Sequence, residues 1–219
     1  MKKIKVLIAT LFVVSSLFAQ EMHPPFWNDI QHFKKEDSIK FPPKDAVLFV
    51  GSSSFTKWKD VQEYFPTTTI INRGFGGSTL PDVIRYANDV INPYHAKQVV
   101  IYCGENDLAS SDTVSAQTVF DRFVTLFHLI RKQQPGVPVA FVSLKPSPSR
   151  EKLWPKMVEA NSLIKTYISK QKKAAFIDVY NKMFNADGTV MKDIFIEDNL
   201  HMNAKGYAIW QQVMKPYLK

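Results

Sequence analysis

The chain has a single cysteine, Cys103, among its 219 residues, so no disulfide can form within it. Its stability must come from a buried core, and a hydrophobic content of 45% in a chain of this length is enough to build one. Cys103 closes the apolar run "QVVIYC", a position typical of a buried, inert thiol. Because no histidine lies near it in the sequence, we do not expect Cys103 to be a nucleophile.

Long apolar runs are also scarce. The one near the start, residues 6–14, is shorter than the roughly 20 residues that span a bilayer. Three lysines precede this run and small residues follow it as far as Ala19, which is the order of a signal peptide. We therefore predict a signal peptide at residues 1–19, and an exported protein, periplasmic or extracellular, without stable membrane insertion.

The sequence lacks a concentrated patch of positive charge. Its formal net charge is +8, and three of the lysines lie in residues 1–19, which hold no acidic residue, so the predicted mature chain carries +5. The remaining basic residues are scattered among helix-forming residues, as on a solvated surface. We expect no nucleic-acid partner.

Several motifs that would define a cofactor or a nucleophile are missing. The five histidines form no H-E-x-x-H pair, and the glycines around Phe75 match neither the phosphate-binding loop nor the dinucleotide fingerprint. The G-x-S-x-G turn of the lipase-type hydrolases is absent too. We predict neither a metal nor a cofactor.

What the chain does contain is a regular alternation of strand-like and helix-like segments. The apolar runs are rich in Val, Ile and Phe without polar alternation, as in strands buried on both faces. The alternation predicts an α/β fold with a parallel sheet between helices, formed by a single domain over residues 20–219. In the helical lead-in at 20–44, we predict a packing helix from Phe26 to Ile39. The expected strands cover 46–50, 69–72, 98–103, 139–143 and 174–179, and the other helices lie around 81–90, 115–134, 152–173 and 203–218.

Polar, glycine-containing segments follow the first three predicted strands: "GSSS" at 51–54, "NRGFGGS" at 72–78 and "GEND" at 104–107. The carboxyl ends of parallel strands meet at one edge, where ligands of such sheets bind. A serine becomes a nucleophile when a histidine takes its proton and a carboxylate orients that histidine. Asp198 and His201, three residues apart, can supply both groups, while Gly77 and Asn106 are candidate donors to an oxyanion. The residues alone leave open which serine acts.

These blocks resemble the SGNH hydrolase family, also called GDSL esterases, from about Pro42 to the C-terminus. The resemblance selects Ser53 as the nucleophile, with Ser54 as second choice. It also implies an Asp198–His201 pair and an oxyanion hole made by Ser53, Gly77 and Asn106. The implied fold is a flavodoxin-like three-layer α/β/α sandwich with a central five-stranded parallel sheet. Two positions depart from the family pattern: Ser52 replaces the usual Asp of the first block, and Asn199 replaces the usual Gly of the last.

The resemblance implies ester hydrolysis through an acyl-enzyme and leaves the substrate open. An acetyl ester on a carbohydrate or a small molecule is the leading expectation, with a lysophospholipid or longer acyl ester behind it. An O-acyltransferase and a non-catalytic glycan-binding protein are the alternatives of a different class. Arg150 and Trp154, in the loop after the fourth strand, are candidate substrate contacts, although a proline-stiffened connection explains that loop equally well. Trp58 is expected in the core.

Overall fold

The computed structural model describes residues 23–219, so the predicted signal peptide lies outside the described residues. Five strands form one parallel sheet in the order β2-β1-β3-β4-β5. The strands are β1 (Val47–Gly51), β2 (Ile70–Gly74), β3 (Gln98–Tyr102), β4 (Val139–Val142) and β5 (Ala174–Ile177). This is the flavodoxin-like order, and the predicted fold is confirmed. Within the described residues, no helix is both long and apolar enough to cross a bilayer.

Strand β1 is apolar from Val47 to Val50 because both faces of the sheet are covered. In β1, Leu48 and Val50 belong to the core on one face, while Val47 and Phe49 belong to the core on the other. Side chains that alternate between two buried layers favour apolar residues at successive positions, whereas the edge strand β2 carries Asn72 and Arg73. The uninterrupted apolar runs of the sequence follow from this arrangement.

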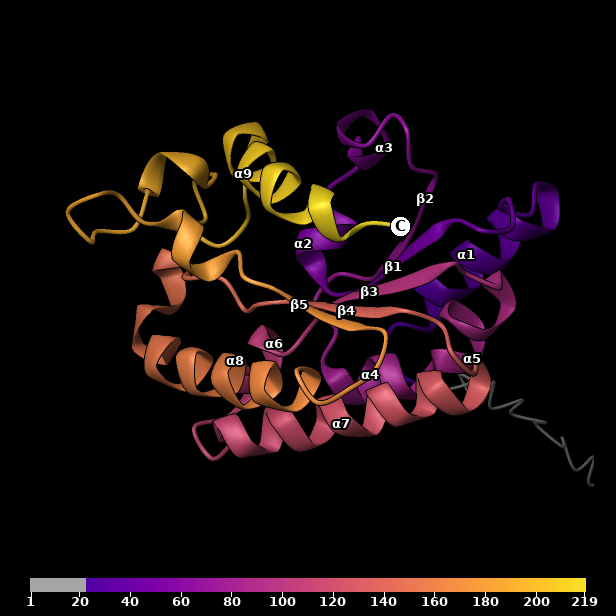
Figure 1. The fold of residues 1–219 in the computed structure, drawn as a ribbon, viewed down its shortest axis with the longest axis horizontal. Coiled ribbons are helices and arrows are strands. Elements are labelled where there is room, and N and C mark those ends of the chain that lie inside the picture. The colour runs from indigo at the N-terminus through magenta and orange to yellow at the C-terminus, as the bar shows by residue number, and fades with distance from the viewer. Residues whose placement is uncertain (1–22) are drawn as a thin grey trace, which may run out of the picture.

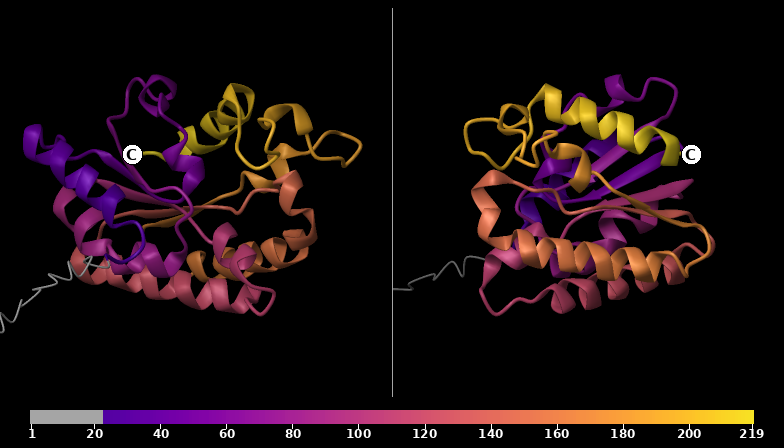
Figure 2. Two further views of the ribbon diagram at one scale, coloured as in Figure 1. Left: turned by 180° about the vertical axis from the view of Figure 1, so that it is seen from behind. Right: turned by 60° about the vertical axis from the view of Figure 1, so that its left-hand side comes forward.

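Helices cover both faces, giving the predicted three layers (Figures 1 and 2). One layer holds α4 (Leu80–Arg85), α5 (Ala87–Val90), α7 (Ala116–Gln133) and α8 (Trp154–Ile168), and the other holds α2 (Ser53–Thr56) and α9 (Ala204–Met214). Two further short helices, α3 (Val61–Tyr64) and α6 (Glu105–Ser110), follow α2 and β3. The single helix predicted at 81–90 is in fact the pair α4 and α5, separated at Tyr86.

The lead-in helix α1 (Trp27–Ile39), close to its predicted bounds, contacts α5 and reaches the edge strand β2. Only Ile30 of this helix is fully buried. Its first turn is fixed by Phe26, whose ring meets Phe75 edge-on at 5.3 Å. Near its end, Asp37 forms an ion pair with Arg73 of β2. The helix is therefore anchored at both ends and leaves much of its surface exposed.

A glycine is required where β1 passes into α2. Gly51 has φ +134°, and a Cβ atom there would lie 1.9 Å from the carbonyl oxygen of Tyr102 on the neighbouring strand. No side chain fits at that distance, and the positive φ is one that L residues rarely adopt. The close approach lets the chain turn within two residues, so that Ser53 begins α2 at the carboxyl edge of the sheet.

Candidate active site

Ser53, His201 and Asp198 form one hydrogen-bonded chain, although Ser53 is 148 residues away from His201 in sequence. His201 Nε2 lies 2.9 Å from Ser53 Oγ, and His201 Nδ1 lies 2.6 Å from Asp198 Oδ2. The carboxylate fixes which nitrogen carries the proton, so that Nε2 faces the hydroxyl as an acceptor. Ser53 stands at the start of α2 and His201 in the loop before α9, so opposite ends of the chain build the site.

The loop around Asp198 is built to hold this carboxylate ionised. Asp198 Oδ1 accepts the backbone N–H groups of Leu200 and His201, each at 2.9 Å. Partial burial raises the pKa of Asp198, but the hydrogen bonds from the His201 side chain and from the two N–H groups outweigh it and lower that pKa to about 2. Asn199 has φ +53°, a conformation that Asn tolerates better than other non-glycine residues. The replacement of the family's glycine by Asn199 thus preserves the turn.

The environments of the three consecutive serines differ. Ser52 and Ser54 are buried, with 2% and 1% of their surface exposed, whereas Ser53 is partly exposed. The carbonyl oxygen of Ser54 accepts a hydrogen bond from the hydroxyl of Tyr207 at 2.8 Å. Only Ser53 reaches the imidazole of His201. The geometry therefore favours Ser53 over Ser54 as the candidate nucleophile.

The predicted oxyanion donors lie on the loops that follow β2 and β3. Gly77 has φ +87°, and no described residue accepts a hydrogen bond from its backbone N–H or from that of Ser53. The side-chain amide of Asn106 donates one hydrogen to the carbonyl oxygen of Ser78 at 3.0 Å. An amide nitrogen carries two hydrogens, so the second one is available to a ligand.

The guanidinium of Arg150 contacts Asn106. Its Nη2 donates to Asn106 Oδ1 at 2.9 Å, and its Nη1 donates to the carbonyl oxygen of Glu105 at 2.8 Å. A guanidinium only donates, so the atom of Asn106 that faces it must be the oxygen. This contact fixes which way the Asn106 amide points. Arg150, predicted as a candidate substrate contact, has these two partners for its guanidinium and also lines a cleft.

Beneath Asn106 lies a buried ionic cluster that the sequence analysis missed. Lys145 Nζ donates to Glu105 Oε2 at 2.7 Å, and the hydroxyls of Tyr102 and Ser147 donate to the same carboxylate, both at 2.6 Å. Burial raises the pKa of Glu105, but Lys145 and Arg150 outweigh it and lower that pKa below its usual value. The signal available in the sequence was a Glu beside the candidate Asn106 and a Lys after the fourth strand.

The other candidate residues from the sequence, Trp154, Trp58 and Cys103, pack or form hydrogen bonds within the protein. Trp154 begins α8, donates its indole N–H to the carbonyl oxygen of Ser147 at 3.0 Å, and meets Phe184 edge-on. Trp58 and Cys103 are fully buried, as predicted. Among the described residues, no three His, Cys, Asp or Glu side chains are grouped to hold a metal ion.

A serine hydrogen-bonded to a histidine and an aspartate, at the carboxyl edge of a parallel α/β sheet, is the arrangement of the serine hydrolases. Residues 44–209 match the GDSL-like lipase/acylhydrolase family, which is most of the chain. The chain belongs to this family and is a carboxylic ester hydrolase. No curated protein is similar enough in sequence to count as a match.

Solved structures of similar fold come from several bacteria. A predicted acylhydrolase from Bacteroides fragilis is 23% identical, with 87% of this chain and 96% of that one covered at a TM-score of 0.73. A GDSL-like lipase from Bacteroides thetaiotaomicron is also 23% identical, with coverage of 86% and 96% and a TM-score of 0.70. A protein from Streptococcus pneumoniae has a TM-score of 0.76 at 19% identity, with coverage of 88% and 92%. At these identities the likeness supports the fold.

Proposed function

We propose that the protein is an exported serine esterase that removes short acyl groups, chiefly acetyl, from carbohydrate or other small-molecule esters. The observation that carries the proposal is the hydrogen-bonded chain from Ser53 through His201 to Asp198. It supplies a nucleophile, a base and an orienting carboxylate in the relative positions that acyl transfer needs.

In the first half of the reaction, Ser53 Oγ attacks the ester carbonyl while His201 Nε2 takes the hydroxyl proton. The carbonyl oxygen gains negative charge and receives hydrogen bonds from Ser53 N–H, Gly77 N–H and the second amide hydrogen of Asn106. His201, now a cation beside Asp198, passes the proton to the oxygen of the leaving alcohol. The C–O bond then breaks, leaving an acyl ester on Ser53.

In the second half, water replaces the alcohol. His201 Nε2 takes a proton from the water as its oxygen attacks the acyl carbonyl, and the same three donors stabilise the new oxyanion. Collapse of this intermediate breaks the bond to Ser53 Oγ, which recovers its proton from His201. The products are a carboxylic acid and the free enzyme.

A short acyl group is favoured by the side chains around the carboxyl edge of the sheet. Three clefts there carry charged or polar side chains, with Asp29 and Lys59 beside Phe33 in one, Thr189 and Asn199 in a second, and Asp112 in a third. A more apolar cleft, lined by Val139 and Ala174 among others, lies at the first residues of the strands and thus at the opposite edge. Polar surroundings favour a polar alcohol over a long acyl chain.

Export is part of this proposal and is supported by the lysine-rich, then apolar, then small-residue order of residues 1–19. An exported enzyme meets ester groups on glycans outside the cytoplasm. The test of export is the N-terminal sequence of the protein recovered outside the cytoplasm, which should begin at Gln20.

The catalytic proposal is tested by acetate release from p-nitrophenyl acetate, with Ser53→Ala and Ser54→Ala compared with the unmodified chain. We expect Ser53→Ala to lose turnover while Ser54→Ala retains it, provided that both variants fold by circular dichroism. If both variants retained turnover, Ser53 would be excluded as the nucleophile. An inert but folded unmodified chain would exclude the esterase and favour a binding protein on the same fold.

A further inference from the structure

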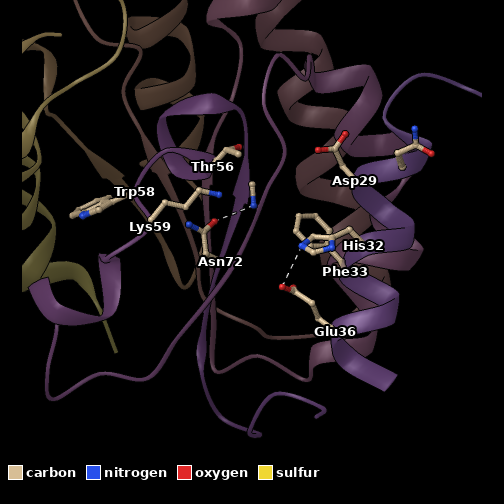
Figure 3. Close-up of a pocket in the computed structure, with 10 residues that line it drawn as sticks. Asp29, His32, Phe33, Glu36, Thr56, Trp58, Lys59 and Asn72 are labelled. Carbon is tan, nitrogen blue, oxygen red and sulfur yellow. Dashed lines mark hydrogen bonds and ion pairs between the residues drawn. The ribbon is translucent and has the colours of Figure 1, made fainter. Parts of the chain in front are cut away.

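A cleft of about 510 Å³ separates α1 from the edge of the sheet (Figure 3). One wall is the exposed side of α1, with Asp29, His32 and Glu36, and the facing wall carries Thr56 and Lys59. Gly74, the last residue of β2, also lines it. The α1 segment was predicted to be a packing helix, and the chemical steps at Ser53 do not use this wall.

The cleft reaches the neighbourhood of Ser53. Thr56, which lines it, follows Ser53 by three residues in α2, so the two side chains lie on the same side of that short helix. A Cβ atom built on Gly76 would lie 3.9 Å from Ser53 Cβ and 3.9 Å from Thr56 Cγ2. Because Gly76 has no side chain, that position is open. A substrate held at Ser53 can therefore extend past Gly76 toward Thr56 and the cleft.

The side chains around the cleft suit a ligand rich in hydroxyl groups. Asp29 and Glu36 accept hydrogen bonds, Lys59 donates them, and Thr56 does both. A sugar hydroxyl both donates and accepts, so it can pair with any of these groups. An alkyl chain would remove water from the same charged groups without forming hydrogen bonds to replace those with water.

A quaternary ammonium ion is a poorer match, because its recognition uses open aromatic faces. Phe33 lines the cleft, but the guanidinium of Arg73 lies over its ring at 5.0 Å. Trp58 is fully buried and stacks on Tyr207 at 4.7 Å. Neither ring is free to form part of a cage.

The α1 wall is held in place before any ligand binds. Trp27–Ile39 precede the part that matches the family, which begins at residue 44. Besides the contacts of Phe26 and Asp37, Lys34 pairs with Asp89 at 2.6 Å and the Tyr86 hydroxyl donates to the carbonyl oxygen of Pro25 at 2.8 Å. A wall that does not have to be ordered on binding lowers the entropic cost of binding.

We propose that this cleft binds the alcohol side of the ester substrate and that this alcohol is a sugar. The inference rests on the proposed function, since the ester carbonyl must lie at Ser53. It gives α1 a role in choosing the substrate. It adds no group to the chemical steps.

The test compares two esters that share an acetyl group and differ in the alcohol: a methyl glucoside carrying one O-acetyl group, and p-nitrophenyl acetate. For Asp29→Ala and Lys59→Ala we expect kcat/KM on the glucoside ester to fall about tenfold through KM, as for the loss of one hydrogen bond to a charged group. On p-nitrophenyl acetate both variants should stay within about twofold of the unmodified chain. Lys35→Ala, an exposed change on the same helix outside the cleft lining, is the matched control and should leave both substrates unaffected.

Three outcomes would overturn this inference and separate it from the esterase proposal. If the unmodified chain hydrolyses both esters and neither cleft variant affects the glucoside ester, the sugar does not bind here. If it hydrolyses p-nitrophenyl acetate but not the glucoside ester, the esterase stands and the sugar assignment falls. If acetylcholine is the better substrate and Asp29→Ala weakens its hydrolysis, the cleft binds a cation instead. An unmodified chain inert toward all three esters would refute the esterase proposal itself.

Discussion

Arg150 Nη2 donates a hydrogen bond to Asn106 Oδ1 over 2.9 Å, and this contact sets the direction of the amide that faces the candidate oxyanion. A flipped amide would turn an oxygen toward the developing negative charge. Since Asn106 Nδ2 also donates to Ser78, the amide is held from both ends. We infer that Arg150 is a positioning residue, acting on the reaction through Asn106.

Arg150→Ala should lower kcat about tenfold with KM little changed, less than the roughly 100- to 1,000-fold cost of removing an oxyanion donor outright. Because Arg150 acts through Asn106, its replacement should have almost no further effect in an Asn106→Ala background. Steady-state kinetics on p-nitrophenyl acetate measure both values. Lys152→Ala, an exposed neighbour in the same turn, serves as the control. Equal losses in the two backgrounds would mean that Arg150 acts independently of Asn106.

Asp198→Asn should lower kcat by about three to four orders of magnitude, since the amide cannot hold the imidazole in the productive tautomer.

The pKa of Asp198 is lowered in the folded chain to about 2. The ionised carboxylate therefore stabilises the fold fully at any pH above the usual pKa of an aspartate, and this stabilisation is lost only as pH falls toward about 2. The difference in unfolding free energy between the unmodified chain and Asp198→Asn should therefore be equal at about pH 7 and about pH 5, and smaller near pH 3. Urea titrations at the three pH values measure it. A difference that already shrinks between pH 7 and pH 5 would contradict the lowered pKa.

Lys145→Met should destabilise the fold by about 3–5 kcal/mol, because it leaves the Glu105 carboxylate buried without its closest cation. Adding Glu105→Gln to this variant should recover much of the loss, since a neutral amide is far cheaper to bury than a charge. Urea denaturation of the two single variants and the double variant gives the coupling. If the loss of unfolding free energy in the double variant equalled the sum of the losses in the two single variants, Lys145 and Glu105 would not be coupled.

Gly51→Ala should prevent folding or cost well over the roughly 1–2 kcal/mol that a non-glycine residue pays at positive φ. Its Cβ would overlap the carbonyl of Tyr102 at 1.9 Å. Gly188 is the matched control, because its φ is +82° but a Cβ there would meet no atom within 4 Å. Gly188→Ala should therefore show the backbone cost alone, measured as the shift in thermal midpoint. Similar shifts for the two variants would contradict the close approach of β1 to β3.

The fold was predictable because hydrophobic periodicity marks buried parallel strands directly. Val47 to Val50 are apolar without interruption since each faces one of two covered layers. The break between α4 and α5 at Tyr86 could not be predicted, because no proline or glycine marks it in the sequence. Boundaries of this kind depend on tertiary packing more than on local sequence.

At the site, the spacing of Asp198 and His201 indicated an acid and a base, but the residues alone left the serine open, and the family resemblance selected Ser53. The sequence could not show that Arg150 faces Asn106, nor that Lys145 lies under it, because both contacts join segments about 40 residues apart through side-chain directions. The sequence also could not show that the polar side of α1 lines a cleft. An amphipathic helix does not reveal whether its exposed side faces solvent or a cleft beside the nucleophile.

The measurement that tests the central claim most directly is the site of covalent labelling by a fluorophosphonate, located by fragmentation of the labelled peptide. A fluorophosphonate reacts with a serine that an adjacent histidine has activated. We expect the label on Ser53 and not on Ser54 in the unmodified chain, and loss of labelling in His201→Ala. A label on any other residue, or labelling of Ser53 that is undiminished in His201→Ala, would contradict the proposed catalytic chain.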